Sequence, residues 1–220
     1  MCSRYALWAI NHLGGRFLIV DPTIGFRSHF NIAPQTENPV VVAAGDGNHL
    51  RAMQWGLVPH WAKDTRTMPR PCNARAGTLS EKPMFRQLLS ENRCLVPANG
   101  FYEWKKEGTR KLPFYFHRPD DSLFAFAGLY DTRQSPSGGT LMSYTIITTD
   151  ANELMAPVHD RMPVILTQEA EQRWLSREPL SPDEIEEILV PCPSDAMEAH
   201  LVSSRVNRPG EDDERLITRV

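Results

Sequence analysis

The sequence predicts a single α+β domain, built mainly as a barrel-like mixed sheet with a few peripheral helices. Most apolar residues fall in short runs rich in Val, Ile, Phe, Tyr and Thr, separated by Gly/Pro/Asp/Ser clusters. Helical periodicity is confined to a few segments. The length of 220 residues fits one ordinary domain with room for a sizeable core.

Strands are expected wherever a β-rich apolar run is bounded by turn-forming residues. Cys2 falls in or beside the first of them. The further expected strands are, in chain order, Arg16–Val20, Val40–Ala44, Leu50–Leu57, Arg93–Pro97, Phe101–Trp104, Pro113–His117, Leu123–Leu129, Met142–Thr149 and Pro163–Leu166.

Four helical segments are expected between or after these strands. A helix capped by Thr78 or Ser80 runs to about Asn92, and a short helical turn follows Asp150, whose carboxylate caps it. A third helix spans Gln168–Arg177. Ser181 to Glu184 forms a capping box with proline at the first helical position, which opens a helix through Leu189.

Charge is distributed unevenly along the chain, although the net charge is only −3. Residues 168–220 carry 13 acidic and 6 basic side chains, whereas residues 1–167 carry 14 acidic and 18 basic ones. This distribution favours an anionic partner on the first three-quarters of the chain, with the acidic end facing solvent. The alternative is that both parts are solvated surface, since no block of consecutive basic residues is present.

Composition excludes several classes of protein. No apolar run approaches the roughly 20 residues of a membrane span, and the N-terminus does not have the pattern of a secretory signal. A cytosolic protein with reduced thiols is therefore expected. The four cysteines form no CxxC pair, so the sequence predicts neither a disulfide framework nor a metal site.

Cys2 is the most informative candidate for chemistry. Removal of the initiator methionine would leave Cys2 with a free α-amine beside its thiol. The amine condenses with an aldehyde to an imine, and the thiolate then closes a five-membered thiazolidine ring. Ordinary pKa values near 8 and 8.5 leave both nucleophiles usable at neutral pH. The alternative is a small buried residue of the first strand.

Two further residues suit proton transfer to and from such a nucleophile. Glu103 lies between large aromatic residues, where low-dielectric surroundings raise a carboxyl pKa. His159 lies in an expected loop, and a neutral imidazole passes protons between a sugar oxygen and solvent. Plain surface pairs, Glu103 with Lys105 and His159 with Asp160, remain open as the alternative.

Amide, guanidinium and aromatic groups complete the candidate site. Asn73 can orient a carbonyl or a sugar hydroxyl, and Arg75 can bind a phosphate with two donors, unless both merely stabilise their own loop. Trp55 is expected in the core and Trp61 outside, where it can stack on a base near Lys63 and Arg66.

These pieces occur in a fixed order along the chain: MCSRY, HFNIAPQT, QWGLVPHWAK, CNARAGT, RCLVPANGFYEWKKEG, TTDANELMAPVHDRMPVIL and SSRVNRPG. In that series the sequence resembles the SOS-response-associated peptidase (SRAP) family. The resemblance implies one domain over residues 1–220, with a core from about 2 to 209 and an acidic tail at 210–220. It also implies a DNA-damage protein that crosslinks to abasic sites in single-stranded DNA and shields them.

The resemblance implies roles residue by residue. Cys2 would form the crosslink after autocatalytic loss of Met1, Asn73 would position it, Glu103 would assist methionine release and proton transfer, and His159 would open the deoxyribose to its aldehyde. A set of basic and apolar residues would bind the strand: Arg4, Arg75 and Arg161 at its backbone, Pro34 and Trp61 near its bases.

The same resemblance implies no cofactor, a weak abasic-site lyase activity and a monomer. It implies a cytoplasmic protein that joins the nucleoid when DNA is damaged, or a nuclear one in a eukaryote. Two positions depart from the family pattern: Gly77 replaces a glutamate and Ser3 replaces a glycine. Because Cys2 and Asn73 are kept, we expect the chemistry to be kept.

Two other functions stay open at this point. One is an N-terminal-nucleophile hydrolase or cysteine peptidase, with Cys2 attacking an amide and His159 as base. Turnover of a peptide in trans would indicate it. The other is a non-catalytic reader of modified bases, which would keep its function in Cys2→Ala.

Overall fold

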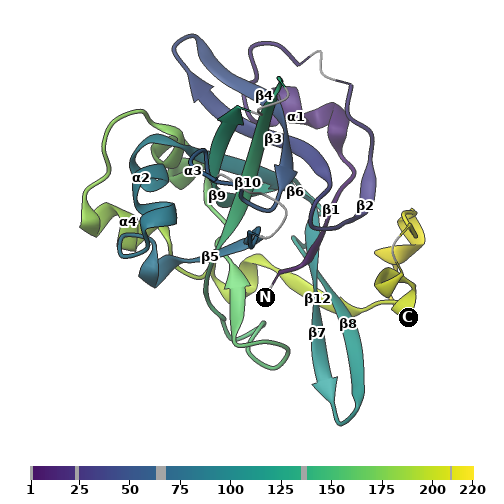
Figure 1. Ribbon diagram of the computed structural model, residues 1–220. Helices are drawn as coiled ribbons and strands as arrows, with labels where there is room; N and C mark the ends of the chain where they lie inside the picture. The colour runs from purple at the N-terminus through teal and green to yellow at the C-terminus, as the bar shows by residue number, and fades with distance from the viewer. Residues whose placement is uncertain (1, 23–24, 63–67, 135–137, 209) are drawn as a thin grey trace.

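The computed structural model describes residues 2–22, 25–62, 68–134, 138–208 and 210–220. Met1, Lys63 and Arg66, which entered the predictions above, lie outside these ranges. Within them the chain is an α+β domain in which one sheet closes into a barrel and a second sheet extends from it (Figure 1). The predicted fold class is confirmed.

Among the described residues, five strands close the barrel in the order β10, β4, β3, β6, β9 and back to β10. β10 pairs parallel with β4 and antiparallel with β9, so the barrel is mixed. Two short strands, β5 and β11, are added to β10 beyond the ring. The bounds are β3 Glu37–Ala44, β4 Gly47–Trp55, β5 Asn73–Arg75, β6 Arg93–Ala98, β9 Phe124–Gln134, β10 Thr140–Asp150 and β11 Arg161–Pro163.

The second sheet has the order β12-β8-β7-β1-β2. Its strands are β1 Arg4–Leu7, β2 His29–Ile32, β7 Gly100–Glu107, β8 Arg110–His117 and β12 Glu198–Leu201. β1 is an inner strand, between β2 and β7, and its start lies near β5 of the barrel sheet (Figure 1). The hairpin of β7 and β8 extends away from the barrel (Figure 1).

Short helices surround the barrel. They are α1 Leu13–Arg16, α2 Pro83–Glu91, α3 Gln168–Leu175 and α4 Pro182–Ile188, with 3-10 turns at Ile10–His12, Ala76–Thr78, Ser194–Ala196, Ser204–Asn207 and Glu214–Leu216. The predicted capping box opens α4: the Ser181 hydroxyl accepts from the Glu184 amide while the Glu184 carboxylate accepts from the Ser181 amide. No helix in the described part of the chain is long and apolar enough to span a bilayer.

Aromatic side chains fill the barrel. Trp55 and Tyr144 stack with ring centres 6.4 Å apart, and Tyr5 meets Trp55 edge-on at 5.2 Å. The hydroxyls of Tyr5 and Tyr144 lie 2.8 Å apart, which gives both buried groups a partner. As predicted, Trp55 is fully buried whereas Trp61 is 53% exposed.

Three predicted elements are wrong in type or bounds. The run at 16–20 is no strand: α1 ends at Arg16, and Leu18 has a φ of 52°, which breaks an extended chain. Helix α2 begins at Pro83, not near Thr78, because proline suits the first helical position and keeps the preceding residue extended. The turn after β10 is capped by Asn152, whose Oδ1 accepts from the Met155 amide, and not by Asp150.

Other predicted segments have shifted bounds. The last predicted strand, 163–166, overlaps β11 only at Pro163, and Ile165 forms a single bridge with Phe126. The third helix ends at Leu175, two residues before the predicted Arg177. The short strands β2, β5 and β12 were not predicted.

Candidate functional site

Cys2 lies two positions before the start of β1 and is 1% exposed in the chain that retains residue 1. The thiol donates to the carbonyl oxygen of Arg4, with Sγ and O 3.7 Å apart. Burial, and then the negative charge of Glu103, raise the pKa of the Cys2 thiol well above its ordinary value. In this form of the chain the sulfur is therefore a neutral thiol.

Asn73 is the first residue of β5, which pairs in parallel with β10. Its side-chain Nδ2 donates to the carbonyl oxygen of Cys2 at 2.8 Å, which fixes the end of the chain against the barrel. Its Oδ1 is buried and finds no hydrogen-bond partner among the residues that the structure describes. A buried acceptor in that state is one that a ligand hydroxyl or amine would satisfy.

Glu103 lies on β7, the strand that pairs with β1 on the side opposite β2. Its side chain is only 5% exposed, and its negative charge contributes to the raised pKa of the Cys2 thiol. The pairing of Tyr5 with Phe101 sets this proximity, because it places the start of β1 beside the middle of β7. A buried carboxylate next to a thiol is suited to move a proton.

His159 lies in the loop that joins β10 to β11. The amide of Arg161 donates to its Nδ1 at 3.0 Å, and Asp160 Oδ1 lies 2.8 Å from the same nitrogen. These two contacts fix the imidazole ring through Nδ1.

A groove of about 490 Å³ joins several of these residues. Arg4, Glu103 and His159 line it together, although they come from β1, β7 and the β10–β11 loop. The remaining lining residues are Ser3, Trp104, Lys106, Lys111 and Asn207. The two lysines were not predicted as site residues. The sequence feature that could have indicated them is the cluster of basic residues on the β7–β8 hairpin, but such a cluster is equally typical of a solvent-exposed surface.

A second cavity, of about 710 Å³, is lined by Asn73 itself. Arg75 and Arg161 line it with Lys82, and the charge of Arg75 is felt at Arg161, whose pKa is lowered first by burial and then by that charge. The Arg161 guanidinium donates to the carbonyl oxygen of Thr148 at 2.8 Å. Asn73 thus lines a cavity that carries three cations, and the first groove carries three more.

Pro34 and Trp61 line neither groove. Pro34 is half-buried in the turn between β2 and β3. Trp61 follows a loop held by barrel side chains: the Ser143 hydroxyl accepts from the Val58 amide at 2.8 Å, and the Asp131 carboxylate accepts from the His60 amide at 2.8 Å. The structure thus presents Trp61 on a fixed backbone but shows no contact between it and Cys2.

The two departures from the family pattern lie in different surroundings. Ser3 lines the first groove. Gly77 lies in a 3-10 turn, where an added Cβ would meet nothing within 4 Å. No group of three or more His, Cys, Asp or Glu side chains in the described ranges is arranged to hold a metal ion.

Comparisons with known proteins identify a family and a shared fold. The family described as SOS response associated peptidase (SRAP) matches residues 1–209. The chain is 42% identical to the abasic site processing protein YoqW of Bacillus subtilis (strain 168), over 99% of both chains. It is 34% identical to the abasic site processing protein HMCES of Xenopus tropicalis, over 68% of this chain and 54% of that protein. A crystal structure of a protein from Bacteroides thetaiotaomicron has a TM-score of 0.90 at 30% identity and covers 100% of both chains.

Proposed function

The chain belongs to the SOS response-associated peptidase family, and on that premise we propose that it binds abasic sites in single-stranded DNA covalently through Cys2. Its relatives are named as abasic site processing proteins. The finer statements that follow (loss of Met1, thiazolidine formation, protection of the lesion and a weak lyase activity) are our proposal.

The 2.8 Å contact between Asn73 and the Cys2 carbonyl is the observation that carries the proposal. It holds Cys2 at a fixed place, under the influence of the buried carboxylate of Glu103, and Asn73 itself lines a cationic cavity. Positioning of this kind converts a bimolecular addition into an effectively unimolecular one. A cysteine that served only to pack the core would need neither the carboxylate nor the grooves.

The first chemical step opens the sugar. An abasic deoxyribose is mostly a cyclic hemiacetal, and its aldehyde forms when the C1′ hydroxyl loses a proton and the ring oxygen gains one. We assign this proton transfer to His159, because its side chain lines the groove and a neutral imidazole has one acceptor and one donor nitrogen. The buried Oδ1 of Asn73 is available as acceptor for the reacting amine or hydroxyl.

The second step closes the crosslink. The Cys2 amine adds to the aldehyde carbon, and the resulting carbinolamine loses one water to give an imine. The sulfur then adds to the imine carbon while the thiol proton passes to the nitrogen, so the net reaction releases one water. Glu103 is placed to carry protons in both directions. Elimination of the 3′ phosphate from the imine would give the weak lyase activity.

Cations line the path of the strand. Arg4, Lys106 and Lys111 face one groove, and Arg75 and Arg161 the other. Guanidinium groups bind phosphate oxygens with two donors, which holds a backbone without reading its sequence. Trp61, 53% exposed, offers a face for base stacking farther along the strand.

Loss of Met1 is a requirement of the proposal. While residue 1 is attached, the nitrogen of Cys2 is an amide and its thiol is buried and neutral. Hydrolysis of that one peptide bond consumes a water, releases methionine and creates the amine. Cys2 then bears both nucleophiles at the end of the chain.

Denaturing gels with a labelled abasic single strand test the proposal. A band that survives heat and detergent without a reducing agent is expected for the wild type, and its absence is expected for Cys2→Ser. Cys72→Ser is the matched control, because that thiol is next to Asn73 and half-buried. If the wild type binds the strand only reversibly, or if Cys2→Ser still crosslinks, the proposal is wrong.

A further inference from the structure

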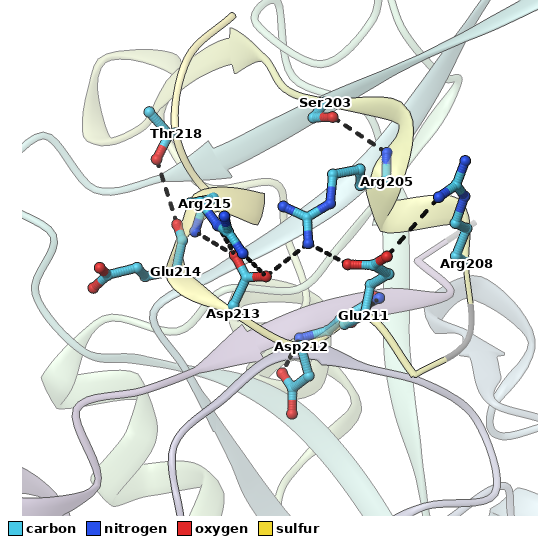
Figure 2. Close-up of polar contacts among 10 residues, drawn as sticks. Ser203, Arg205, Arg208, Glu211, Asp212, Asp213, Glu214, Arg215 and Thr218 are labelled. Carbon is cyan, nitrogen blue, oxygen red and sulfur yellow. Dashed lines mark hydrogen bonds and ion pairs between the residues drawn. The ribbon is translucent and has the colours of Figure 1, made fainter.

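The C-terminal segment, residues 203–208 and 210–217, packs back onto the second sheet, and its polar contacts are drawn in Figure 2. Leu216 is fully buried, in one cluster with Tyr102 of β7. Two acidic groups of the segment are paired within it: Arg205 binds both Glu211 and Asp213. This part of the chain is therefore a folded element, and most of its charge is balanced locally.

Asp212 attaches this segment to β2. Its Oδ1 accepts from the amides of Phe30 and Asn31, at 2.6 and 3.1 Å, and its Oδ2 lies 2.7 Å from Nδ1 of His29. One carboxylate thus holds three successive residues of an edge strand. The backbone of Asn31 is fixed as a result.

The side chain of Asn31 continues the link toward the groove. Its Nδ2 donates to the carbonyl oxygens of Val206 and Glu211, at 3.2 and 2.8 Å. Because both partners can only accept, the amide nitrogen must face the C-terminal segment and Oδ1 must face away from it. There Oδ1 accepts from Nη1 of Arg4 at 3.2 Å.

Arg4 lines the groove that also contains Glu103 and His159. We infer that Asn31 is a positioning residue for DNA binding: anchored by the C-terminal segment, it holds the Arg4 guanidinium where it meets a phosphate. The inference rests on the proposed function, since it assigns a role in DNA binding. Arginine has a long flexible side chain, so a partner that fixes it beforehand lowers the cost of ordering it on binding.

A purely structural role for Asn31 predicts a different outcome. In that case its removal would loosen the C-terminal segment and lower stability, but the effect on DNA binding would not depend on Arg4. If Asn31 acts through Arg4, its effect disappears once Arg4 is gone. A double-mutant cycle separates the two cases.

The experiment measures reversible binding of the full chain to an unmodified oligothymidylate over a range of salt concentrations. Arg4→Ala is expected to weaken binding and to reduce the slope of log K against log salt by about 0.7, the value for one phosphate contact on a single strand. Asn31→Ala is expected to weaken binding about fivefold, as for the loss of one hydrogen bond. In the Arg4→Ala background, Asn31→Ala should add nothing.

Two further variants make the result independent of folding. Asp212→Ala leaves Asn31 in place but removes the clamp on its backbone; it should weaken binding in the same direction and also lose its effect in the Arg4→Ala background. Asn48→Ala is the matched control, because its amide donates to the Phe17 carbonyl at 2.9 Å, outside both grooves. It should bind as the wild type does.

The outcomes are distinct. Additive effects of Asn31→Ala and Arg4→Ala, or an unchanged affinity in Asn31→Ala and Asp212→Ala, would overturn the inference while leaving the proposed function intact. Failure of the wild type to bind any single strand would overturn both. Coupled losses that vanish without Arg4 support the inference, whatever the fate of the covalent step.

Discussion

Replacing Glu103 by glutamine is expected to change two properties of Cys2 in opposite directions. The carboxylate raises the pKa of the Cys2 thiol, so its removal should increase the thiolate fraction at a given pH. The same carboxylate is the proposed proton carrier of the crosslinking reaction, so its removal should slow that reaction. Glutamine keeps the shape and the burial, which isolates the charge and the titratable proton.

The magnitudes follow from the two roles. Below its pKa, a thiol gains tenfold in thiolate for each unit by which the pKa falls, which corresponds to about 1.4 kcal/mol. Alkylation of Cys2 in the chain that has lost Met1 should therefore be faster, by up to about tenfold per unit of pKa relieved. Loss of a general acid–base group costs roughly 10²- to 10⁴-fold, so crosslinking should be slower by about that factor.

The assay follows alkylation by iodoacetamide at Cys2 over a pH range, by peptide mass, beside the rate of crosslinking to saturating abasic strand. Glu107→Gln is the matched control: it removes the same charge from the same strand, at an exposed residue paired with Lys105. It should leave both rates unchanged. An alkylation profile that stays in place, or moves to higher pH, in Glu103→Gln would refute the electrostatic reasoning, and an unchanged crosslinking rate would refute the proton-transfer role.

Three other predictions concern the positioning and the stability of the site. Asn73→Ala should slow crosslinking about tenfold at saturating strand, as expected for one lost hydrogen bond to Cys2, while the affinity for unmodified strand stays the same. A weaker affinity with an unchanged crosslinking rate would contradict the positioning role. Glu171→Ala should lower the free energy of unfolding by about 3–5 kcal/mol in urea titrations, because it leaves the Arg16 guanidinium without the carboxylate that it contacts at 2.7 Å. A loss below about 1 kcal/mol would contradict this prediction. Burial lowers the pKa of His200 from its ordinary 6.5, so the unfolded chain binds more protons than the folded chain as the pH falls below that value. The contribution of His200 to stability is therefore present above about pH 6.5 and lost at lower pH. Urea unfolding at pH 7 and pH 5 measures this loss, and an equal loss in His200→Gln would show that another group is responsible.

The fold class could be predicted because the barrel strands are nearly continuous apolar runs. β6 and β9, for example, are buried along most of their length, and such runs are bounded by recognisable turns. The short strands could not be predicted in the same way. β5 is three residues long and becomes a strand only because Ile146 and Thr148 of β10 pair with Asn73 and Arg75. The run at 16–20 was misleading because its apolar alternation, with Phe17 and Ile19 buried and Leu18 exposed, is produced by a turn.

The candidate site was predicted mainly from the resemblance to a family and only partly from the residues themselves. The spacing of Cys2 and Asn73, 71 positions apart, does not indicate that they are in contact. Tertiary structure brings them together. Lys106 and Lys111 were overlooked because basic residues on a hairpin are commonly solvated surface. The link from the C-terminal segment through Asn31 to Arg4 has no sequence signature, since its bonds join residues 27 to 180 positions apart and two of the three go to backbone carbonyls.

The mass of the intact chain, recorded before and after incubation with an abasic single strand, tests the central claim most directly. The proposal predicts that the starting mass is lower than that of the printed sequence by one methionine residue. It further predicts that the product equals protein plus strand less one water, under denaturing conditions and without a reductant. A chain that keeps its methionine and still gains the strand, or a chain that loses it and gains nothing, would contradict the account.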